Sequence, residues 1–250
     1  MLEKTPPSDL VTMDLGLCPY QEAWTLQKEL QRKLLDGTGH DTLIFCEHTP
    51  TITIGRSAKP DNVLLSKEEL KKKGVELFEI ERGGDVTYHG PGQLVAYPIL
   101  DLKRKRRDVG WYLRTLELII INTLKDLSVE SFTICGLTGV WTNGVKNYNN
   151  VGLTPDHQER AKIASIGVRI SRWCTLHGLS LNIKDCSDGF GLINPCGFKD
   201  IQITSVEELG GKADISVARI RMEKWFRELL AYNDNGEIND EEGYSAKSCR

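Results

Sequence analysis

Strand-like runs occur in clusters along this chain, and only a few helical segments separate them. Because strands and helices do not alternate strictly, a doubly wound parallel sheet is disfavoured and an α+β domain is predicted. The sequence also lacks a dinucleotide-binding G-x-G-x-x-G motif after a strand and a P-loop motif, which disfavours those two classes of protein. Strands are expected at 42–46, 51–54, 75–80, 93–100, 138–142, 162–170 and 174–183.

Four helices are expected from apolar residues at helical spacing and from residues that start or stop helices. One of them begins with a capping box at Ser66–Glu69, and Gly74 ends it. No internal repeat or Pro/Gly/Ser-rich linker divides the chain, so residues 1–232 are interpreted as a single domain. The polar, acidic residues 233–250 are predicted to form a disordered tail. The other three helices are expected at 21–35, 108–127 and 216–230.

Composition and charge limit where such a chain works. Apolar residues make up 40% and charged residues 27%, which is ordinary for a globular protein. A formal net charge of −3 provides no general attraction to nucleic acid or to an anionic membrane. The longest apolar stretch, around 116–121, is too short to span a membrane, and the polar N-terminal segment argues against a signal or transit peptide. A cytoplasmic protein without nucleic-acid or membrane partners is therefore expected.

Seven cysteines are scattered along the sequence without a C-x-x-C pair. Their odd number and spacing indicate neither a disulfide framework nor a metal site, and a reducing compartment fits best. Cys196 lies in the turn-like sequence NPCG, where a thiol can be exposed as a nucleophile requires. Cys46 and Cys135 are expected to be buried and inert. Cys174 is a rival nucleophile, but its place inside an expected strand favours a packing role.

The segment RGGDVTYHGPGQ at 82–93 carries four glycines in twelve residues. Glycines let the backbone approach a ligand closely and leave amide N–H groups pointing outward. One interpretation is a hairpin with tight turns, in which Arg82 is a surface charge and His89 a structural histidine. The density of polar side chains between two strand-like runs favours a binding loop instead.

The segment KIASIGVRI at 162–170 places a lysine on an apolar face. If the strand starts at Lys162, alternation puts this residue on the same face as Ala164, Ile166, Val168 and Ile170. One interpretation is that Lys162 lies at the strand's edge and extends to water. The functional alternative is a partly desolvated lysine whose neutral amine acts as a general base.

The glycine-rich, lysine and cysteine segments, in this order, resemble the lipoyl(octanoyl) transferase family. The resemblance covers about 40–210 and implies a mixed β-sheet flanked by helices, as in lipoate and biotin protein ligases. The acyl chain is then expected in a pocket beside the glycine-rich loop. The motifs are EHTPTITIGR at 47–56, RGGDVTYHGPGQL at 82–94, KIASIG at 162–167, RWCTLHGLSLN at 172–182 and NPCG at 194–197.

By position, the resemblance implies that Cys196 forms the acyl thioester and that Lys162 activates it. It further implies that no cofactor is needed, since the donor thioester is already activated. The substrate-binding residues that it implies are Arg82, Gly83, Gly84, Asp85, Val86, Thr87, Tyr88, His89, Ser165, Ile166, Gly167, Gly178, Leu179 and Ser180.

The implied reaction moves an octanoyl group from octanoyl-acyl carrier protein to the lysine of an apo lipoyl domain. The acceptors implied are the lipoyl domains of 2-oxoacid dehydrogenase complexes and the glycine cleavage H protein. Because acyl carrier proteins are acidic, the basic run Lys103–Arg107 is a candidate docking patch, although a solvated basic loop explains it equally well. A monomer is expected.

Two stretches depart from the family pattern, and three other functions stay open. Residues 143–160 are longer than the usual hairpin, and the tail after 232 is additional. An ATP-dependent lipoate or biotin protein ligase would share the scaffold but would not need Cys196. A catalytically idle carrier-binding module is a second alternative. A cysteine hydrolase with His89 or His177 as base is a third, weakened by the lack of a supporting Asp or Asn motif.

Overall fold

The computed structural model describes residues 10–143, 160–195 and 201–230. Eleven strands lie in these ranges: β1 Val11–Cys18, β2 Thr42–His48, β3 Thr51–Ile54, β4 Glu76–Glu79, β5 Val86–His89, β6 Gln93–Ile99, β7 Phe132–Ile134, β8 Leu137–Asn143, β9 Arg160–Ser171, β10 Cys174–Asn182 and β11 Gln202–Ile203. The α-helices are α1 Tyr20–Leu35, α2 Lys67–Lys72, α3 Val109–Asp126, α4 Ser187–Phe190 and α5 Ile215–Leu230, with 3₁₀ turns η1 at Pro60–Asn62 and η2 at Leu102–Arg104.

The strands form one large sheet and one small sheet. The large sheet has the order β1-β2-β6-β10-β9-β8-β7, and β11 pairs with β9 beside this path. β1 lies parallel to β2 and β11 parallel to β9, whereas the other neighbours in the large sheet are antiparallel. The small sheet has the order β4-β3-β5. The expected α+β fold, a mixed sheet flanked by helices, is confirmed.

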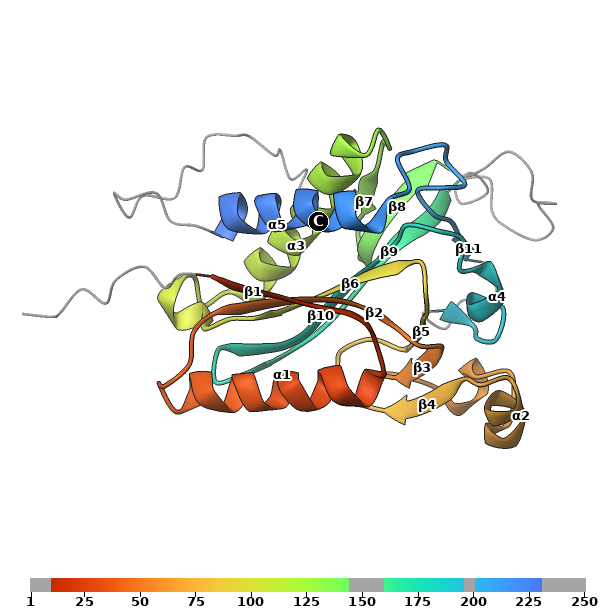
Figure 1. The fold of residues 1–250 in the computed structure, drawn as a ribbon, viewed down its shortest axis with the longest axis horizontal. Helices are drawn as coiled ribbons and strands as arrows, with labels where there is room; N and C mark the ends of the chain where they lie inside the picture. The colour runs from red at the N-terminus through yellow and green to blue at the C-terminus, as the bar shows by residue number, and fades with distance from the viewer. Residues whose placement is uncertain (1–9, 144–159, 196–200, 231–250) are drawn as a thin grey trace, which may run out of the picture.

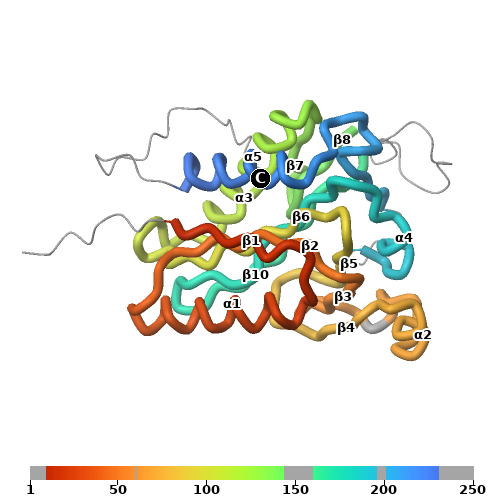
Figure 2. The backbone as a smooth tube through the Cα atoms, viewed as in Figure 1, coloured from red at the N-terminus to blue at the C-terminus, as the bar shows by residue number. Residues whose placement is uncertain are grey.

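Helices cover both faces of the large sheet. Figure 1 shows α3 and α5 side by side on one face and α1 on the opposite face. The backbone trace in Figure 2 follows the same three-layer arrangement, with α2 and the small sheet at one end. None of the helices in the described ranges is long and apolar enough to cross a membrane.

Alternation along the central strands divides the core between these two faces. In β2, Leu43 and Phe45 belong to the core under α3 and α5, whereas Ile44 and Cys46 belong to the core under α1. Strands buried on both faces have near-continuous apolar sequences, which is why these runs stand out in the sequence. The burial expected for Cys46 is confirmed, and so is the packing role of Cys174 in the α1 core.

Local capping signals hold in the structure. The Ser66 side chain accepts a hydrogen bond from the amide of Glu69, and the Glu69 carboxylate accepts one from the amide of Ser66, so the capping box of α2 is complete. Asp108 caps α3 by accepting a hydrogen bond from the amide of Trp111 at 2.9 Å. These contacts depend on residues within one turn of each other, which explains why the sequence reveals them.

Other expectations were wrong or fall outside the described residues. β1 was not expected; it is a largely exposed edge strand with a register shift between Asp14 and Leu17, so it lacks an apolar alternation. β5 lies inside the segment interpreted as a loop, because Val86–His89 pairs with β3. Cys135, expected to be buried, is exposed. The predicted tail at 233–250 and most of the 143–160 stretch lie outside the described residues.

Candidate functional site

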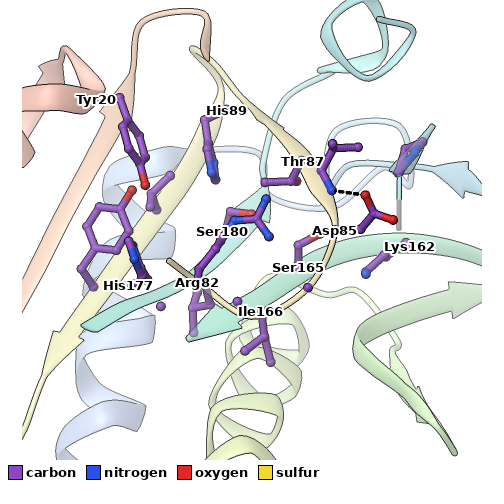
Figure 3. Close-up of a pocket in the computed structure, with 18 residues that line it drawn as sticks. Tyr20, Arg82, Asp85, Thr87, His89, Lys162, Ser165, Ile166, His177 and Ser180 are labelled. Atoms are coloured by element: carbon purple, nitrogen blue, oxygen red, sulfur yellow. Dashed lines mark hydrogen bonds between the residues drawn. The ribbon is translucent and has the colours of Figure 1, made fainter. Parts of the chain in front are cut away.

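A pocket lies where the glycine-rich segment crosses the large sheet. Its lining comes from α1, the segment 82–85, the strands β5, β6, β9 and β10, and Pro195. The lining residues are Tyr20, Arg82, Gly84, Asp85, Val86, Thr87, His89, Val95, Tyr97, Lys162, Ser165, Ile166, Gly167, His177, Gly178, Leu179, Ser180 and Pro195. In Figure 3, Tyr20 and His177 lie at one end of this pocket, Lys162 and Asp85 lie at the other, and Arg82 lies between them.

Strand register brings two of the predicted segments together. β9 and β10 are antiparallel, and Gly167 pairs with Gly178 while Ser165 pairs with Ser180. The segments 165–167 and 178–180 therefore lie side by side in the sheet and line the pocket together. Residues of the glycine-rich segment line the same pocket. Twelve of the fourteen residues expected to bind substrate line the pocket, together with Lys162.

Gly83 and Tyr88 do not line the pocket, contrary to expectation. The Gly83 amide donates a hydrogen bond to the Val168 carbonyl at 3.0 Å, so this residue fastens the loop to β9. The Tyr88 ring packs against Phe190 at a centroid distance of 5.8 Å, in a small core beside the pocket. Both positions support the pocket wall from behind.

Arg82 is a buried residue and not the surface charge that one interpretation expected. Its side chain donates hydrogen bonds to the backbone carbonyl of Thr53 at 2.7 Å, to the Thr53 hydroxyl at 3.0 and 3.2 Å, and to the Gly83 carbonyl at 3.0 Å. Arg82 also packs closely on Gly167, where a Cβ would lie 3.0 Å from Cδ of Arg82. The guanidinium thus joins the glycine-rich loop to β3 and places a cation in the pocket wall.

Lys162 is also buried, with 4% of its surface exposed. The interpretation that it extends to water from the edge of the strand is therefore wrong. Its Nζ lies 5.5 Å from the ring centroid of Trp141 on β8. Lys162 is therefore a buried residue of the pocket lining, and its role as a general base stays a prediction.

The pocket holds two buried histidines, His89 and His177. His89 Nδ1 lies 2.7 Å from Oε1 of Gln93. The ring nitrogens of His177 have no hydrogen-bond partner within the described part of the chain, although Nε2 lies 3.9 Å from Oε1 of Glu81. Burial lowers the pKa of each imidazole to about 3, and at His177 the charge of Arg82 adds to this effect. Both rings are therefore neutral at physiological pH.

These depressed pKa values predict that the fold loses stability in mild acid. Unfolded histidines bind a proton near pH 6.5, whereas the folded ones stay neutral, so the unfolded state gains stability as the pH falls from about 6.5 towards 3. The linkage amounts to roughly 2 kcal/mol per histidine at pH 5. Urea unfolding of His177→Gln between pH 7 and 5 is expected to show a shallower loss than the original chain. The exposed His40→Gln is the matched control, and an equal slope in all three proteins would contradict the prediction.

The aromatic end of the pocket was not predicted from the sequence. Tyr20, at the start of α1, stacks on His89 at a centroid distance of 6.0 Å and an interplanar angle of 15°. Tyr97 and Val95 reach the lining from β6. In the sequence these three resemble ordinary core residues, and no local signal separates them from the others. The packing of α1 on the sheet brings Tyr20 to the pocket, and the pairing of β6 with β10 brings Val95 and Tyr97 there.

A thiol–imidazole cluster lies behind this aromatic wall. Cys46 Sγ lies 3.5 Å from His48 Nε2, and Cys18 Sγ lies 3.9 Å from His48 Nδ1. These three residues are a donor set of the kind that binds soft metal ions. His48 Nδ1, however, already contacts the Cys18 carbonyl oxygen at 3.1 Å, and Nε2 contacts the Tyr97 hydroxyl at 2.7 Å. A metal ion would have to displace one of these partners, so the contacts fit a structural network that supports the pocket wall.

The predicted nucleophile, Cys196, lies outside the described residues. The residue before it, Pro195, lines the same pocket as Lys162. Pro195, the last residue of the range 160–195, is therefore part of the pocket.

The basic run Lys103–Arg107 includes η2 and follows β6. Lys103 and Arg104 lie 3.8 and 3.7 Å from the Asp101 carboxylate. Lys105 lies 3.9 Å from Asp41 and donates a hydrogen bond to the Leu230 carbonyl at 2.8 Å. Neighbouring carboxylates thus offset part of the positive charge. The run follows the end of β6 that lies away from the glycine-rich segment (Figure 1).

Comparisons with known proteins agree with this arrangement. A model of the lipoyl protein ligase A/B catalytic domain matches residues 19–228. An octanoyltransferase from Koribacter versatilis is 43% identical over 203 residues, which cover 80% of this chain and 76% of that protein. An octanoyltransferase from Porphyromonas gingivalis is 41% identical over 221 residues, but the chain spans only 43% of its length. The crystal structure of a lipoate-protein ligase A bound with ATP matches with a TM-score of 0.65 at 16% identity, over 90% of this chain and 85% of that one.

Proposed function

Because the chain belongs to the octanoyltransferases of the lipoyl protein ligase A/B family, we propose that it transfers an octanoyl group to the lysine of a lipoyl domain. We further propose that octanoyl-acyl carrier protein is the donor and that Cys196 carries the group as a thioester. One observation above all supports this chemistry. A single pocket combines a buried lysine, the glycine-rich loop and the residue next to Cys196.

The proposed reaction is a double displacement. The neutral amine of Lys162 takes the proton of the Cys196 thiol, and the thiolate attacks the carbonyl carbon of the donor thioester. The bond to the phosphopantetheine sulfur breaks, and Lys162 returns the proton to that leaving thiol. The acceptor lysine's amine then attacks the Cys196 thioester and transfers a proton through Lys162 to the departing cysteine sulfur. The product is an amide, which is more stable than either thioester.

The pocket has features that suit each half of this reaction. Its floor carries apolar side chains such as Ile166 and Leu179, against which an acyl chain packs. His89 and His177 are neutral, so their imidazoles bring no positive charge against that chain. Backbone amides of the glycine-rich loop are candidate donors to the oxyanion that each attack creates.

For the acyl carrier protein, we retain Lys103–Arg107 as a candidate docking patch. Lys103, Arg104 and Arg107 are exposed, and the Asp101 carboxylate offsets only part of their positive charge. Arg106 is also exposed but lies 3.5 Å from Asp108, and Lys105 contacts the Leu230 carbonyl. Changing Lys103, Arg104 and Arg107 to glutamate is expected to raise KM for octanoyl-acyl carrier protein about tenfold at low salt, with kcat unchanged. The control assay uses octanoyl-coenzyme A, which lacks the acidic protein, and its KM should stay constant. An unchanged KM for the carrier protein at low salt would remove the patch from the proposal.

The decisive experiment for the proposed function is intact-protein mass spectrometry after mixing the protein with octanoyl-acyl carrier protein in the absence of ATP. An octanoyl adduct that maps to Cys196 and is discharged by an apo lipoyl domain is the expected result. Transfer that requires ATP and free octanoate would instead identify a ligase. Absence of both reactions would leave a carrier-binding module.

A further inference from the structure

Glu117 is a buried carboxylate on the side of α3 that packs on the large sheet. Only 1% of its surface is exposed, and Leu116, Ile119, Ile120 and Leu124 of the same helix belong to the apolar core. Burying a carboxylate is unfavourable unless polar or charged groups compensate for the lost water. The groups that compensate here are the Gly139 amide and the Arg114 guanidinium, and Gly139 also lies beside Lys162.

Two direct partners hold the carboxylate. Oε1 accepts a hydrogen bond from the Gly139 amide on β8 at 3.1 Å, and Oε2 lies 2.6 Å from the guanidinium of Arg114 one helical turn earlier. Burial raises the pKa of the Glu117 carboxyl, whereas the Gly139 amide, Arg114 and the positive charge of Lys162 each lower it. The carboxylate and the Lys162 amine therefore interact electrostatically.

Gly139 is the structural link between these two side chains. Its φ is +122°, and a Cβ at this position would lie 2.8 Å from Cε of Lys162 and 2.7 Å from the Ala164 carbonyl oxygen. The register between β8 and β9 shifts just after it, between Val140 and Trp141. The Gly139 backbone thus contacts the Glu117 carboxylate through its amide and provides the space that the Lys162 side chain occupies.

We infer that Glu117 is a positioning residue for Lys162, because its carboxylate anchors the Gly139 backbone, whose missing side chain leaves the space that the lysine occupies. This inference rests on the proposed function, in which Lys162 accepts and returns the proton. It explains why the sequence places a carboxylate on the buried face of α3. It also relates the register shift between β8 and β9 to the position of Lys162.

Several other charged or titratable groups surround Lys162 and share in its electrostatics. Arg114 lies on α3 beside Glu117. The residues that pair with Lys162 across the sheet, Trp141 on β8 and Ile203 on β11, carry no charge. The pocket itself contributes Tyr20, Arg82, Asp85, Tyr97, His89 and His177. Any test of Glu117 must therefore remove its charge and leave these groups in place.

Glu117→Gln meets this condition, because the amide oxygen still accepts the Gly139 hydrogen bond. We expect the acidic limb of the kcat–pH profile to move to lower pH, because the substitution removes the electrostatic interaction between the Glu117 carboxylate and Lys162. KM for octanoyl-acyl carrier protein is expected to stay constant. The matched control is Asp126→Asn, which neutralises another carboxylate of α3 that accepts a hydrogen bond from Trp225 Nε1 at 3.0 Å. This control should keep the original pH profile.

A second measurement tests the same link without relying on catalysis. Urea unfolding of the original chain, Glu117→Gln, Lys162→Met and the double variant forms a thermodynamic cycle. We expect Glu117→Gln to lower the urea midpoint in the original chain and to change it less in the Lys162→Met background. If Lys162→Met keeps full activity, the proposed role of the lysine fails while this cycle still measures the link. Superimposable pH profiles, or equal midpoint shifts in both backgrounds, would overturn the inference.

Discussion

Replacing Cys196 with alanine is expected to abolish both acylation of the protein and transfer to the lipoyl domain. The alanine side chain has no nucleophilic atom, so the covalent step of the proposed reaction cannot occur. Cys196→Ser should also lose nearly all activity, because a hydroxyl is far less acidic than a thiol and is a weaker nucleophile at neutral pH. The measurements are the octanoyl adduct by intact mass spectrometry and the transfer rate to an apo lipoyl domain.

A matched cysteine variant separates this loss from a general effect of removing a thiol. Cys186 is a buried free cysteine whose Sγ lies 3.4 Å from the Lys184 carbonyl oxygen, and it does not line the pocket. Cys186→Ala is expected to acquire the octanoyl group and transfer it. Full transfer activity in Cys196→Ala would refute the thioester mechanism. An adduct that persists on another residue of that variant would relocate the nucleophile.

Replacing Lys162 with methionine is expected to lower kcat by about 10²–10⁴-fold, the usual contribution of a general acid–base group. Methionine retains an unbranched, apolar side chain in this buried place, so the loss should come from the missing amine. KM for the donor should change little. Because the proposed lysine serves both halves of the reaction, loading of Cys196 and discharge to the acceptor should both slow. Rapid-quench measurement of each half-reaction provides the two rates.

The control for this variant is Lys125→Met, which removes an exposed lysine from the last turn of α3. It is expected to retain the rates of the original chain. Thermal unfolding of both variants shows whether either has lost its fold. A Lys162→Met protein that is folded and loads Cys196 at the original rate would assign proton transfer to a different group.

Much of the fold could be predicted because its signals are local. The clusters of strands, the Ser66 capping box and the Asp108 cap each depend on residues close together in the sequence. The edge strand β1 escaped prediction, since its pairing with β2 provides backbone hydrogen bonds but buries few of its side chains. Local sequence patterns therefore identify strands and helices that bury one apolar face. They do not identify a strand such as β1, which is held mainly by backbone hydrogen bonds to its neighbour.

The residues that carry the proposed chemistry could be identified from residue type and local spacing: the glycine-rich segment, the lysine at the start of an apolar strand and the cysteine of NPCG. Their environment could not, because it depends on contacts between distant segments. Arg82 is buried where Thr53 accepts its hydrogen bonds, and burial keeps the His177 ring neutral. The Gly139 backbone contacts Glu117 and leaves room for Lys162. The physical reason is that residue type and local spacing are written along the chain, whereas desolvation and charge pairing arise between segments that only folding brings into contact.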